Sequence, residues 1–487
     1  MLFNSVTFLL FLGIVVCLYW ILGRKARTPM LFISSLVFYG FWRWDFLGLM
    51  LFSTILDYFI SLKLETTENQ NKRKTLLMVS LVVNLGLLVV FKYLFFFTEN
   101  INSVMSFLDA NGRIVPLKLI LPLGISFYTF QTISYTIDVY RKHLKPEKNF
   151  FLYGTFVTFF PQLVAGPILR ASEVMLQLLN RPSFKISYII EGSKRILYGL
   201  FLKVVLADNI APLVDAGFAQ SAASLTALDV AMLAFMFGFQ IYFDFAGYSH
   251  IAIGCAKLMG IKFPENFNFP YLASSFRSFW KRWHISLSSW IRDYLYLPIL
   301  GVKVIDRNSK SQGGIETIQS QSVRNPTFAL FATWALMGLW HGANWTFMLW
   351  GVYHAVFIYL ERLVQKLKFI ERLRTNLIGW LIVLPIAMLS WIPFRAASLA
   401  ETFTMYSKLF QPSQYLHYSL RENNYLIVVI LLLGVIISSG LTKIKLDLTK
   451  PWMIGTKIAF DSIKYSIMLF LVFVFLRPIS QFIYFQF

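Results

Sequence analysis

Cysteine and charge are both scarce in this sequence. Its 487 residues include only two cysteines, Cys17 and Cys255, and each lies in an apolar stretch without metal-ligand residues nearby. Neither a disulfide framework nor a zinc site follows from them, and we interpret both as structural. Only 14% of the residues are charged, whereas 57% are hydrophobic and 17% aromatic, which is not the composition of a soluble surface.

Several chemical signatures are also missing. The sequence has no HExxH motif, no clustered cysteine and histidine ligands and no GxSxG elbow, so it shows no sign of a zinc or serine hydrolase. An SxxK match at Ser278 to Lys281 lacks its companion motifs, and we interpret it as chance. The N-terminus has no basic segment before its apolar stretch, so we expect a retained first span rather than a cleaved signal peptide.

Long apolar runs are the main feature that is present. A helix needs roughly 20 residues to cross a bilayer, and several runs approach or exceed that length. We therefore predict an all-α, polytopic integral membrane protein. Its clearest spans are expected at Ser5 to Leu22, Thr75 to Phe97, Leu377 to Trp391, Tyr425 to Ser439 and Ser466 to Phe475.

The formal charge of +21 could indicate a nucleic-acid partner. The basic residues, however, form short clusters between apolar runs rather than one patch, so no nucleic-acid partner is predicted. Such clusters are typical of cytoplasmic loops. They are Arg24/Lys25/Arg27, Lys63/Lys72/Arg73/Lys74, Arg141/Lys142/Lys145/Lys148, Lys303/Arg307/Lys310/Arg324, Arg362/Lys366/Lys368/Arg372/Arg374 and Lys443/Lys445/Lys450/Lys457.

Placing every cluster in the cytoplasm predicts one path through the bilayer. Both termini then lie outside, and an early hairpin turns near Trp42 and Asp45. The polar stretch Glu99 to Arg113 is external, and Leu117 to Tyr140 returns to the cytoplasm. A second hairpin, through Trp334 and Tyr353, places His341 toward its outer half.

The segment from Asn149 to Gly301 has a different pattern. Its apolar stretches are interrupted by proline, glycine, acidic and basic residues. Interrupted backbone at membrane depth is tolerated only where protein or a water-filled cavity satisfies it, so we expect re-entrant or broken helices that line a pocket. The interruptions are Pro161, Gly166, Pro167, Asp208, Asp244, Gly247, Pro264 and Pro270.

Polar side chains recur at helical spacing between Ser275 and Leu300. We expect Arg277, Lys281, His284, Ser288 and Arg292 to share one face of a single helix, with aromatic residues on its flank and back. This pattern fits an interfacial helix whose cations reach lipid headgroups. It fits equally a basic, aromatic-walled passage for an anionic substrate.

A second informative segment runs from Thr333 to Ala355. His341 lies in its middle beside Trp340 and Asn344, with no charged neighbour, and an ionisable group at such depth is a functional candidate. The alternative is a histidine hydrogen-bonded to a neighbouring helix. We interpret His354, near the inner end of the returning span, as structural. A neutral imidazole could remove the proton of an attacking hydroxyl.

Two acidic residues lie in otherwise apolar surroundings, Asp138 and Asp244. We favour structural pairs that lock helices together. The alternative is that they pair with the basic side chains around Arg277 or orient a histidine.

Segments spread over the middle of the chain resemble the membrane-bound O-acyltransferase family, in its bacterial branch that includes alginate O-acetyltransferase. The resemblance implies one membrane-embedded domain over 1–487, with a motif-bearing core at 121–355 and peripheral spans at 1–120 and 356–487. It also implies a multi-helix fold around a central tunnel. The segments that carry it are LPLGISFYTFQTISYTIDVYR (121–141), FPQLVAGPI (160–168), YFDFAGYSHIAIGCAKLMGI (242–261), WHISLSSWIRDYLYLPILG (283–301) and GLWHGANWTFMLWGVYHA (338–355).

The resemblance implies a catalytic role for His341 and, as partner, His284. The candidate substrate-binding residues are Arg277, Lys281, Ser288, Trp340 and Asn344, and no metal or bound cofactor is expected. Because a thioester donor is already activated, acyl transfer needs neither.

The implied reaction moves an acyl group, most simply acetyl, from acetyl-CoA or an acyl carrier protein. The group crosses the bacterial inner membrane toward an exported polysaccharide or peptidoglycan, directly or through a periplasmic acetyltransferase. D-alanyl transfer toward teichoic acid is the alternative within the family. From the residues alone, a transporter or flippase and a scaffold for a secretion complex also stay open, although no internal repeat favours a transporter.

Overall fold

The computed structural model of the chain describes residues 1–109, 112–164, 166–180, 182–304, 317–318, 324–365, 376–443 and 451–476. These residues form two compact units. The first unit comprises Met1–Ser193, Ala252–Pro264 and Asp293–Val323, and the second comprises Lys194–Ile251, Glu265–Arg292 and Arg324–Phe487. Most residues of the basic clusters predicted at 303–324, 362–374 and 443–457 lie outside the described ranges.

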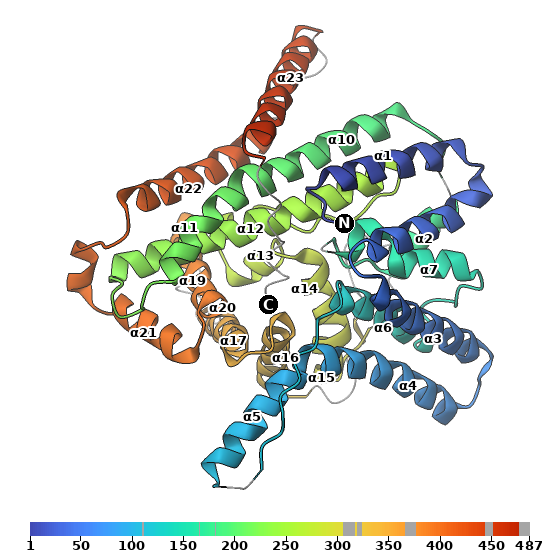
Figure 1. Ribbon diagram of the computed structural model, residues 1–487, viewed down its shortest axis with the longest axis horizontal. Coiled ribbons are helices and arrows are strands. Elements are labelled where there is room, and N and C mark those ends of the chain that lie inside the picture. Colours follow the sequence, from blue (N-terminus) through green and yellow to red (C-terminus); the bar gives the residue numbers. More distant parts are fainter. Residues whose placement is uncertain are drawn as a thin grey trace. The chain divides into compact units, whose positions relative to one another are not determined.

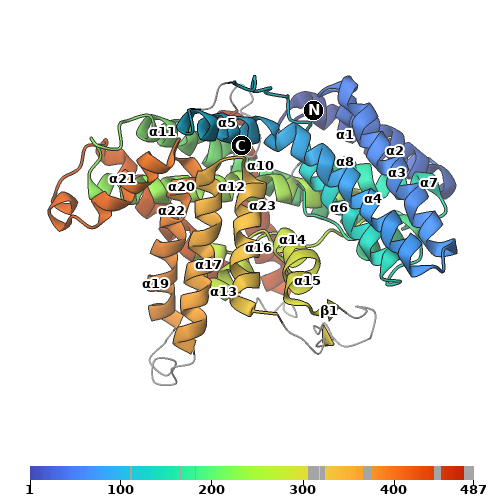
Figure 2. The same ribbon diagram turned by 90° about the horizontal axis from the view of Figure 1, so that it is seen from below.

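The first unit is built from helices that begin at short polar caps. Ser5, Asn69 and Asn149 each accept a backbone hydrogen bond from the first turn that follows them. Helices α3, α4 and α6 pack side by side, as Figures 1 and 2 both show. The elements are α1 (Val6–Ile21), α2 (Arg24–Gly40), η1 (Trp44–Phe46), α3 (Leu47–Thr66), α4 (Gln70–Leu88), η2 (Val89–Tyr93), α5 (Leu94–Phe107), α6 (Ile125–Tyr140), α7 (Phe150–Thr158), α8 (Phe160–Leu163), α9 (Ala171–Asn180), α15 (Leu297–Leu300) and the antiparallel pair β1 (Lys303–Val304) and β2 (Thr317–Ile318).

A buried polar cluster joins α3 to α4. Asp57 of α3 accepts hydrogen bonds from Ser80 Oγ at 2.5 Å and from Asn84 Nδ2 at 2.7 Å, both on α4. Asn84 Oδ1 in turn accepts from Ser53 Oγ at 2.5 Å. Because each of these side chains is fully buried, the bonds offset the cost of removing them from water and fix how the two helices meet.

The second unit contains most of the residues that the sequence singles out. Helix α10 (Ile186–Leu200) leads into it, and α12 (Ala227–Leu258) leads out of it. Its other elements are η3 (Phe201–Ala207), α11 (Asp208–Phe218), η4 (Pro270–Leu272), α13 (Phe276–Trp280), α14 (Ile285–Ile291), η5 (Arg292–Tyr296), which continues into the first unit, α16 (Pro326–His341), α17 (Trp345–Gln365), α19 (Asn376–Leu389), α20 (Trp391–Arg395), α21 (Leu399–Leu409), η6 (Pro412–Leu416), α22 (Glu422–Lys443) and α23 (Pro451–Val474).

Helices α16 and α17 form a tight antiparallel hairpin, which Figures 1 and 2 show side by side. Glycine makes the close approach possible. A Cβ atom added at Gly338 would overlap the carbonyl oxygen of Phe347, and one added at Gly351 would overlap that of Trp334. The backbones therefore touch where any larger side chain would separate them, and this contact fixes the position of His341 at the end of α16.

The hairpin contact predicts that Gly351→Ala destabilises the protein. The added methyl group meets a backbone carbonyl that cannot move aside, and overpacking of this kind costs about 1–3 kcal/mol. The expected result is a lower thermal midpoint of the detergent-solubilised protein, measured by size-exclusion chromatography of heated samples. Gly434→Ala is the matched control, because a Cβ at this helical glycine meets nothing within 4 Å. Equal midpoints for the two variants would contradict the role of Gly351.

Seven helices among the described residues are long and apolar enough to cross a membrane. They are Trp44–Thr66, Gln70–Phe107, Ile186–Phe218, Ala227–Leu258, Trp345–Gln365, Asn376–Arg395 and Glu422–Leu441, and Val6–Ile21 and Phe150–Leu163 are shorter apolar helices. The all-α prediction is thus confirmed, and every predicted span falls mainly on a helix. Leu117 to Tyr140 is helical only from Ile125, since Gly124 adopts a left-handed conformation at φ 70° and starts α6 there. The helix before it continues to Phe107, into the stretch predicted to be external and polar.

Broken helices were predicted between Asn149 and Gly301, and the structure confirms them only in part. The chain breaks at Phe159, between α7 and α8, and is non-helical around Pro264. It does not break at Asp244 or Gly247, which both lie within the continuous helix α12, so that part of the prediction is wrong.

A buried ion cluster explains why α12 continues through Asp244. Lys203 of η3 lies 2.8 Å from Asp244 Oδ1 and 2.8 Å from Asp208 Oδ1, and only 2% of its side chain is exposed. Because the carboxylate has this cation as partner, the helix need not open to hydrate it. Beside the cluster, a Cβ added at Gly199 of α10 would lie 2.6 Å from the carbonyl oxygen of Gly247 in α12. The backbones of these two helices are therefore in close contact at their glycines.

Asp138 is likewise held by a partner on another element. Its Oδ2 accepts a hydrogen bond of 2.7 Å from the hydroxyl of Tyr294 in η5. The neighbouring Asp293 pairs with Arg170 at 2.6 Å, and both of these charged side chains are buried. The preferred prediction for Asp138 and Asp244, contacts that join elements, is therefore confirmed.

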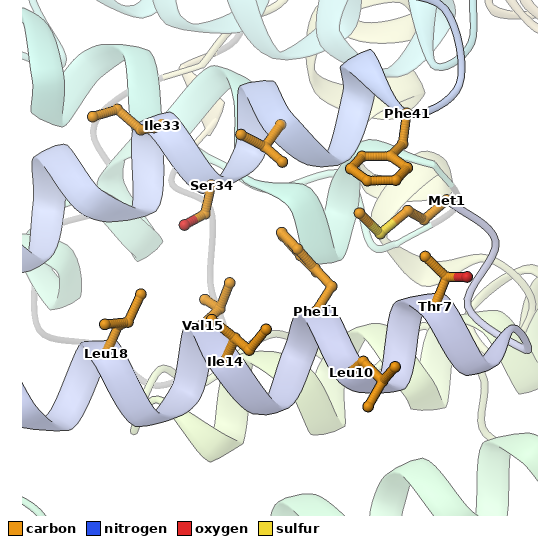
Figure 3. A pocket seen from close by; sticks show the side chains of 11 residues that line it. Met1, Thr7, Leu10, Phe11, Ile14, Val15, Leu18, Ile33, Ser34 and Phe41 are labelled. Atoms are coloured by element: carbon orange, nitrogen blue, oxygen red, sulfur yellow. The ribbon is translucent and has the colours of Figure 1, made fainter.

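A cavity of about 450 Å³ lies between α1 and α2 in the first unit (Figure 3). Its walls are apolar apart from Thr7 and Ser34, and include Leu10, Ile14 and Phe41. None of the residues proposed for catalysis lines it. The tunnel that the family resemblance implies stays a prediction.

Candidate functional site

His341 is the last residue of α16, at the point where the hairpin turns. Its ring is 4% exposed and lies among aromatic rings, at centroid distances of 4.8 Å from Trp340, 4.9 Å from Trp350 and 5.4 Å from Phe394. Gly342 follows in extended conformation, where a side chain would overlap the ring of Phe347. The imidazole is thus held between the end of one helix and the start of the next, in apolar surroundings.

Asn344 and Trp340 flank this histidine in different ways. Asn344 is half-buried and its Oδ1 accepts a hydrogen bond of 3.1 Å from the backbone nitrogen of Thr346, so it caps the start of α17. Trp340 is buried, with its ring against the imidazole of His341. The structure therefore places both predicted residues at the turn that holds His341. Trp340 packs against the imidazole, and Asn344 caps helix α17.

The chain from Ser275 to Leu300 is not the single helix that its spacing predicts. Helix α13 ends at Trp280, α14 begins at Ile285, and His284 between them adopts a left-handed conformation with φ 41° and ψ 57°. This conformation costs a residue with a Cβ on the order of 1–3 kcal/mol and persists only where its surroundings enforce it. The prediction of one helix face is therefore wrong.

The break separates the residues that were expected to lie together. His284 is fully buried, whereas Arg277, Lys281 and Arg292 are exposed. Ser288 is half-buried, and its hydroxyl donates to the carbonyl oxygen of Trp283 at 3.2 Å. Within the second unit, Arg277 and Lys281, the basic candidates for substrate binding, are thus at the surface, whereas His284 lies in the interior.

Aromatic rings link the two candidate histidines through the second unit. From His341 the path runs to Trp350 at 4.9 Å, then to Trp391 at 6.0 Å and Trp283 at 5.0 Å. It continues to Phe267 at 5.2 Å, whose ring lies 6.3 Å from that of His284. The structure therefore places His341 and His284 in one aromatic core, joined by intervening rings.

His354 of α17 lies in the same core and is fully buried. Its Nε2 is 3.1 Å from Ser390 Oγ, and that hydroxyl donates its own hydrogen to the carbonyl oxygen of Ala387 at 2.6 Å. Nε2 must then donate to Ser390, which ties α17 to the end of α19. The structural role predicted for His354 is in keeping with this bond.

Sequence reasoning missed Asn266, whose side chain contacts His284. Asn266 is 1% exposed, and its Oδ1 lies 3.1 Å from His284 Nδ1. Burial lowers the pKa of His284, which lies outside the seven candidate spans, to about 3, so the ring is neutral at physiological pH. Nothing in the spacing of the sequence connects the two residues, which are 18 positions apart.

The family model and the similar proteins all point to acyl transfer. The model of the membrane-bound O-acyltransferase family matches residues 141–315. The chain is 38% identical over 416 residues to the probable alginate O-acetylase AlgI of Azotobacter vinelandii, covering 84% of this chain and 78% of that protein. It is 35% identical over 435 residues to the peptidoglycan O-acetyltransferase of Helicobacter pylori, covering 82% and 78%. To the teichoic acid D-alanyltransferase of Bacillus subtilis it is 30% identical over 257 residues, which cover 52% of this chain and 61% of that protein.

Proposed function

The chain belongs to the membrane-bound O-acyltransferase family, and from this premise we propose that it transfers an acetyl group from a cytoplasmic thioester toward a hydroxyl of an exported cell-surface polymer. It is an O-acyltransferase and a multi-pass membrane protein. The observation that carries the proposal is the similarity to O-acetyltransferases over more than four fifths of the chain. His341 and His284 both lie within the aromatic core of the second unit.

The reaction forms one bond and breaks another. The hydroxyl oxygen of the acceptor attacks the carbonyl carbon of the thioester, a C–O bond forms, and the C–S bond breaks. His341 takes the proton of the hydroxyl, and that proton finally neutralises the departing thiolate as a free thiol. A neutral imidazole is suited to this step, because general bases of this kind accelerate transfer by about 10²–10⁴-fold.

The remaining candidate residues have narrower proposed roles. Arg277 and Lys281 are exposed cations that we assign to the phosphates of the acyl donor, acetyl-CoA or an acyl carrier protein. We assign Trp340, Asn344 and Ser288 as substrate-binding residues that contact the reacting groups. His284 we assign as the second histidine of the site.

The relatives support the proposals for the acceptor and for the membrane. The A. vinelandii relative is described as acting on alginate and the H. pylori relative on peptidoglycan, so we propose an exported polysaccharide or peptidoglycan as acceptor. The membrane is then the bacterial inner membrane, and a periplasmic acetyltransferase is the proposed partner that completes the transfer. D-alanyl transfer is the second candidate, supported by the B. subtilis relative over about half of the chain.

The proposal is tested by giving membrane vesicles radiolabelled acyl donors. The vesicles come from a strain that makes the exported polymer, with and without an intact copy of this chain, and receive labelled acetyl-CoA or labelled D-alanyl carrier protein. We expect label from acetyl-CoA in the polymer fraction only when the chain is present. Label from the D-alanyl carrier instead would establish the second candidate. No label from either donor would reject acyl transfer and favour a transporter.

A further inference from the structure

Asn266 comes before η4 in the sequence, and in space it contacts the first turn of helix α14. Its backbone carbonyl oxygen accepts a hydrogen bond of 2.9 Å from Ile285, and its Oδ1 lies 3.2 Å from the backbone nitrogen of Ser286 and 2.9 Å from that residue's Oγ. The first backbone N–H groups of a helix need such acceptors, and His284, the N-cap residue of α14, makes no side-chain cap hydrogen bond. Asn266 therefore caps α14 from another segment of the chain.

The orientation of the Asn266 amide follows from these contacts. A backbone N–H can only donate, so the atom that faces Ser286 must be the amide oxygen. The amide nitrogen then points the other way and donates to Ser249 Oγ of α12 at 3.1 Å. A flipped amide would place two donors against each other at Ser286, so the contacts allow one orientation.

This orientation determines the tautomer of His284. Its Nδ1 lies 3.1 Å from the same oxygen, Asn266 Oδ1, which can only accept. Nδ1 must therefore carry the proton, and Nε2 of the neutral ring carries a lone pair. His284 Nε2 is buried and has no hydrogen-bond partner among the described residues. Phe245, 4.6 Å away between ring centroids, packs against the ring at right angles and further limits its rotation.

We propose that Asn266 is a positioning residue of the acyl-transfer site, which holds His284 as the Nδ1–H tautomer so that Nε2 faces the reacting groups as an acceptor. The link to acyl transfer rests on the proposed function, whereas the tautomer does not. The neutral ring can then accept a proton or a hydrogen bond at Nε2. It cannot donate one to the oxygen of the thioester carbonyl, so another group must stabilise the charge that develops there.

The tautomer is tested first, without any assay of activity. Nitrogen chemical shifts of detergent-solubilised protein labelled at its six histidines distinguish a protonated ring nitrogen from an unprotonated one. The signal of His284 is assigned by its loss in His284→Gln. We expect Nδ1 protonated and Nε2 unprotonated in the unaltered protein. The opposite tautomer would overturn the proposal.

The positioning role is tested with a pair of variants at Asn266. Asn266→Asp keeps an oxygen that accepts from His284 Nδ1 and Ser286, whereas Asn266→Leu has the same shape and no acceptor. We expect Asn266→Asp to keep the tautomer and most of the acetyl transfer in the vesicle assay. Asn266→Leu is expected to lose the single tautomer and to slow transfer at least about 10-fold, the effect of one hydrogen bond at a reacting centre.

Asn268→Leu is the control, because Asn268 is exposed in the same loop and its backbone nitrogen donates to the carbonyl oxygen of Arg282. It should behave like the unaltered protein. If Asn266→Leu does not insert, Asn266→Ala replaces it, because this smaller side chain also lacks the oxygen that accepts from His284 Nδ1. Retention of the tautomer and the rate in Asn266→Leu, or in Asn266→Ala where it takes that place, would overturn the proposal. Absence of transfer in the unaltered protein would reject the proposed function and leave the tautomer result standing.

Discussion

Replacing His341 by alanine is expected to abolish ester acylation of the exported polymer in living cells. The imidazole is the proposed base for the attacking hydroxyl, and its loss should lower the rate by about 10²–10⁴-fold. The measurement is the amount of ester released by mild alkali from purified polymer, per unit of protein in the membrane. His341→Phe should give the same loss, although its ring preserves the contacts with Trp350 and Phe394.

The control for this experiment is another histidine. His417 is exposed, and its backbone oxygen accepts a hydrogen bond from the hydroxyl of Thr226. His417→Ala should therefore leave the polymer ester at its normal level. Normal acylation in cells that carry His341→Phe would show that the ring nitrogens of His341 are dispensable, and the base would have to be sought elsewhere.

Replacing Lys203 by methionine is expected to destabilise the fold more than any surface substitution. The change leaves the carboxylates of Asp208 and Asp244 without the cation between them, and removing one partner of a buried ion pair costs about 3–5 kcal/mol. The expected result is a large drop in the thermal midpoint of the solubilised protein, or loss of the monodisperse peak altogether. Lys185→Met, at an exposed lysine, should leave the midpoint unchanged.

A second variant separates charge from packing at this cluster. Adding Asp244→Leu to Lys203→Met removes the buried carboxylate together with the cation, and such apolar replacement of a buried pair is often close to neutral. We expect the double variant to regain much of the lost stability. If Lys203→Met alone were as stable as Lys185→Met, the cluster would not be the reason why α12 stays continuous through Asp244.

The sequence predicts the helical membrane architecture well because the signal is local. A run such as Tyr425 to Ser439 has no alternative to a helix in lipid, since every backbone group must be satisfied within the segment. The structure has α22 there, and α1 begins at Val6, directly after its cap residue Ser5, where the apolar run starts. The orientation of these helices in the bilayer, taken from the basic clusters, stays a prediction.

The arrangement around His284 could not be predicted, because it depends on contacts between distant segments. Helical periodicity counts positions along one helix, and by that count Lys281, His284 and Ser288 share a face. The break between α13 and α14 depends on Asn266, which caps α14 and holds the histidine. A partner residue also explains why the helix break predicted at Asp244 is wrong. An acidic residue in an apolar run suggests a break, but Lys203 supplies the positive charge that pairs with this carboxylate.

The roles of single residues in the site stay predictions for a similar reason. Family resemblance points to His341 by its motif, and the structure adds its buried position at the end of α16. The shared helix face on which the spacing places Arg277 and Lys281 does not exist, and it is their exposure and charge that support contact with a donor.

Release of free thiol from acetyl-CoA shows directly whether His341 acts in acyl transfer. It is measured with polymer-containing membrane vesicles that carry the unaltered chain, His341→Phe or His417→Ala. We expect thiol release that depends on the chain, falls to background with His341→Phe and is unchanged with His417→Ala. Equal thiol release by all three would exclude His341 from the reaction.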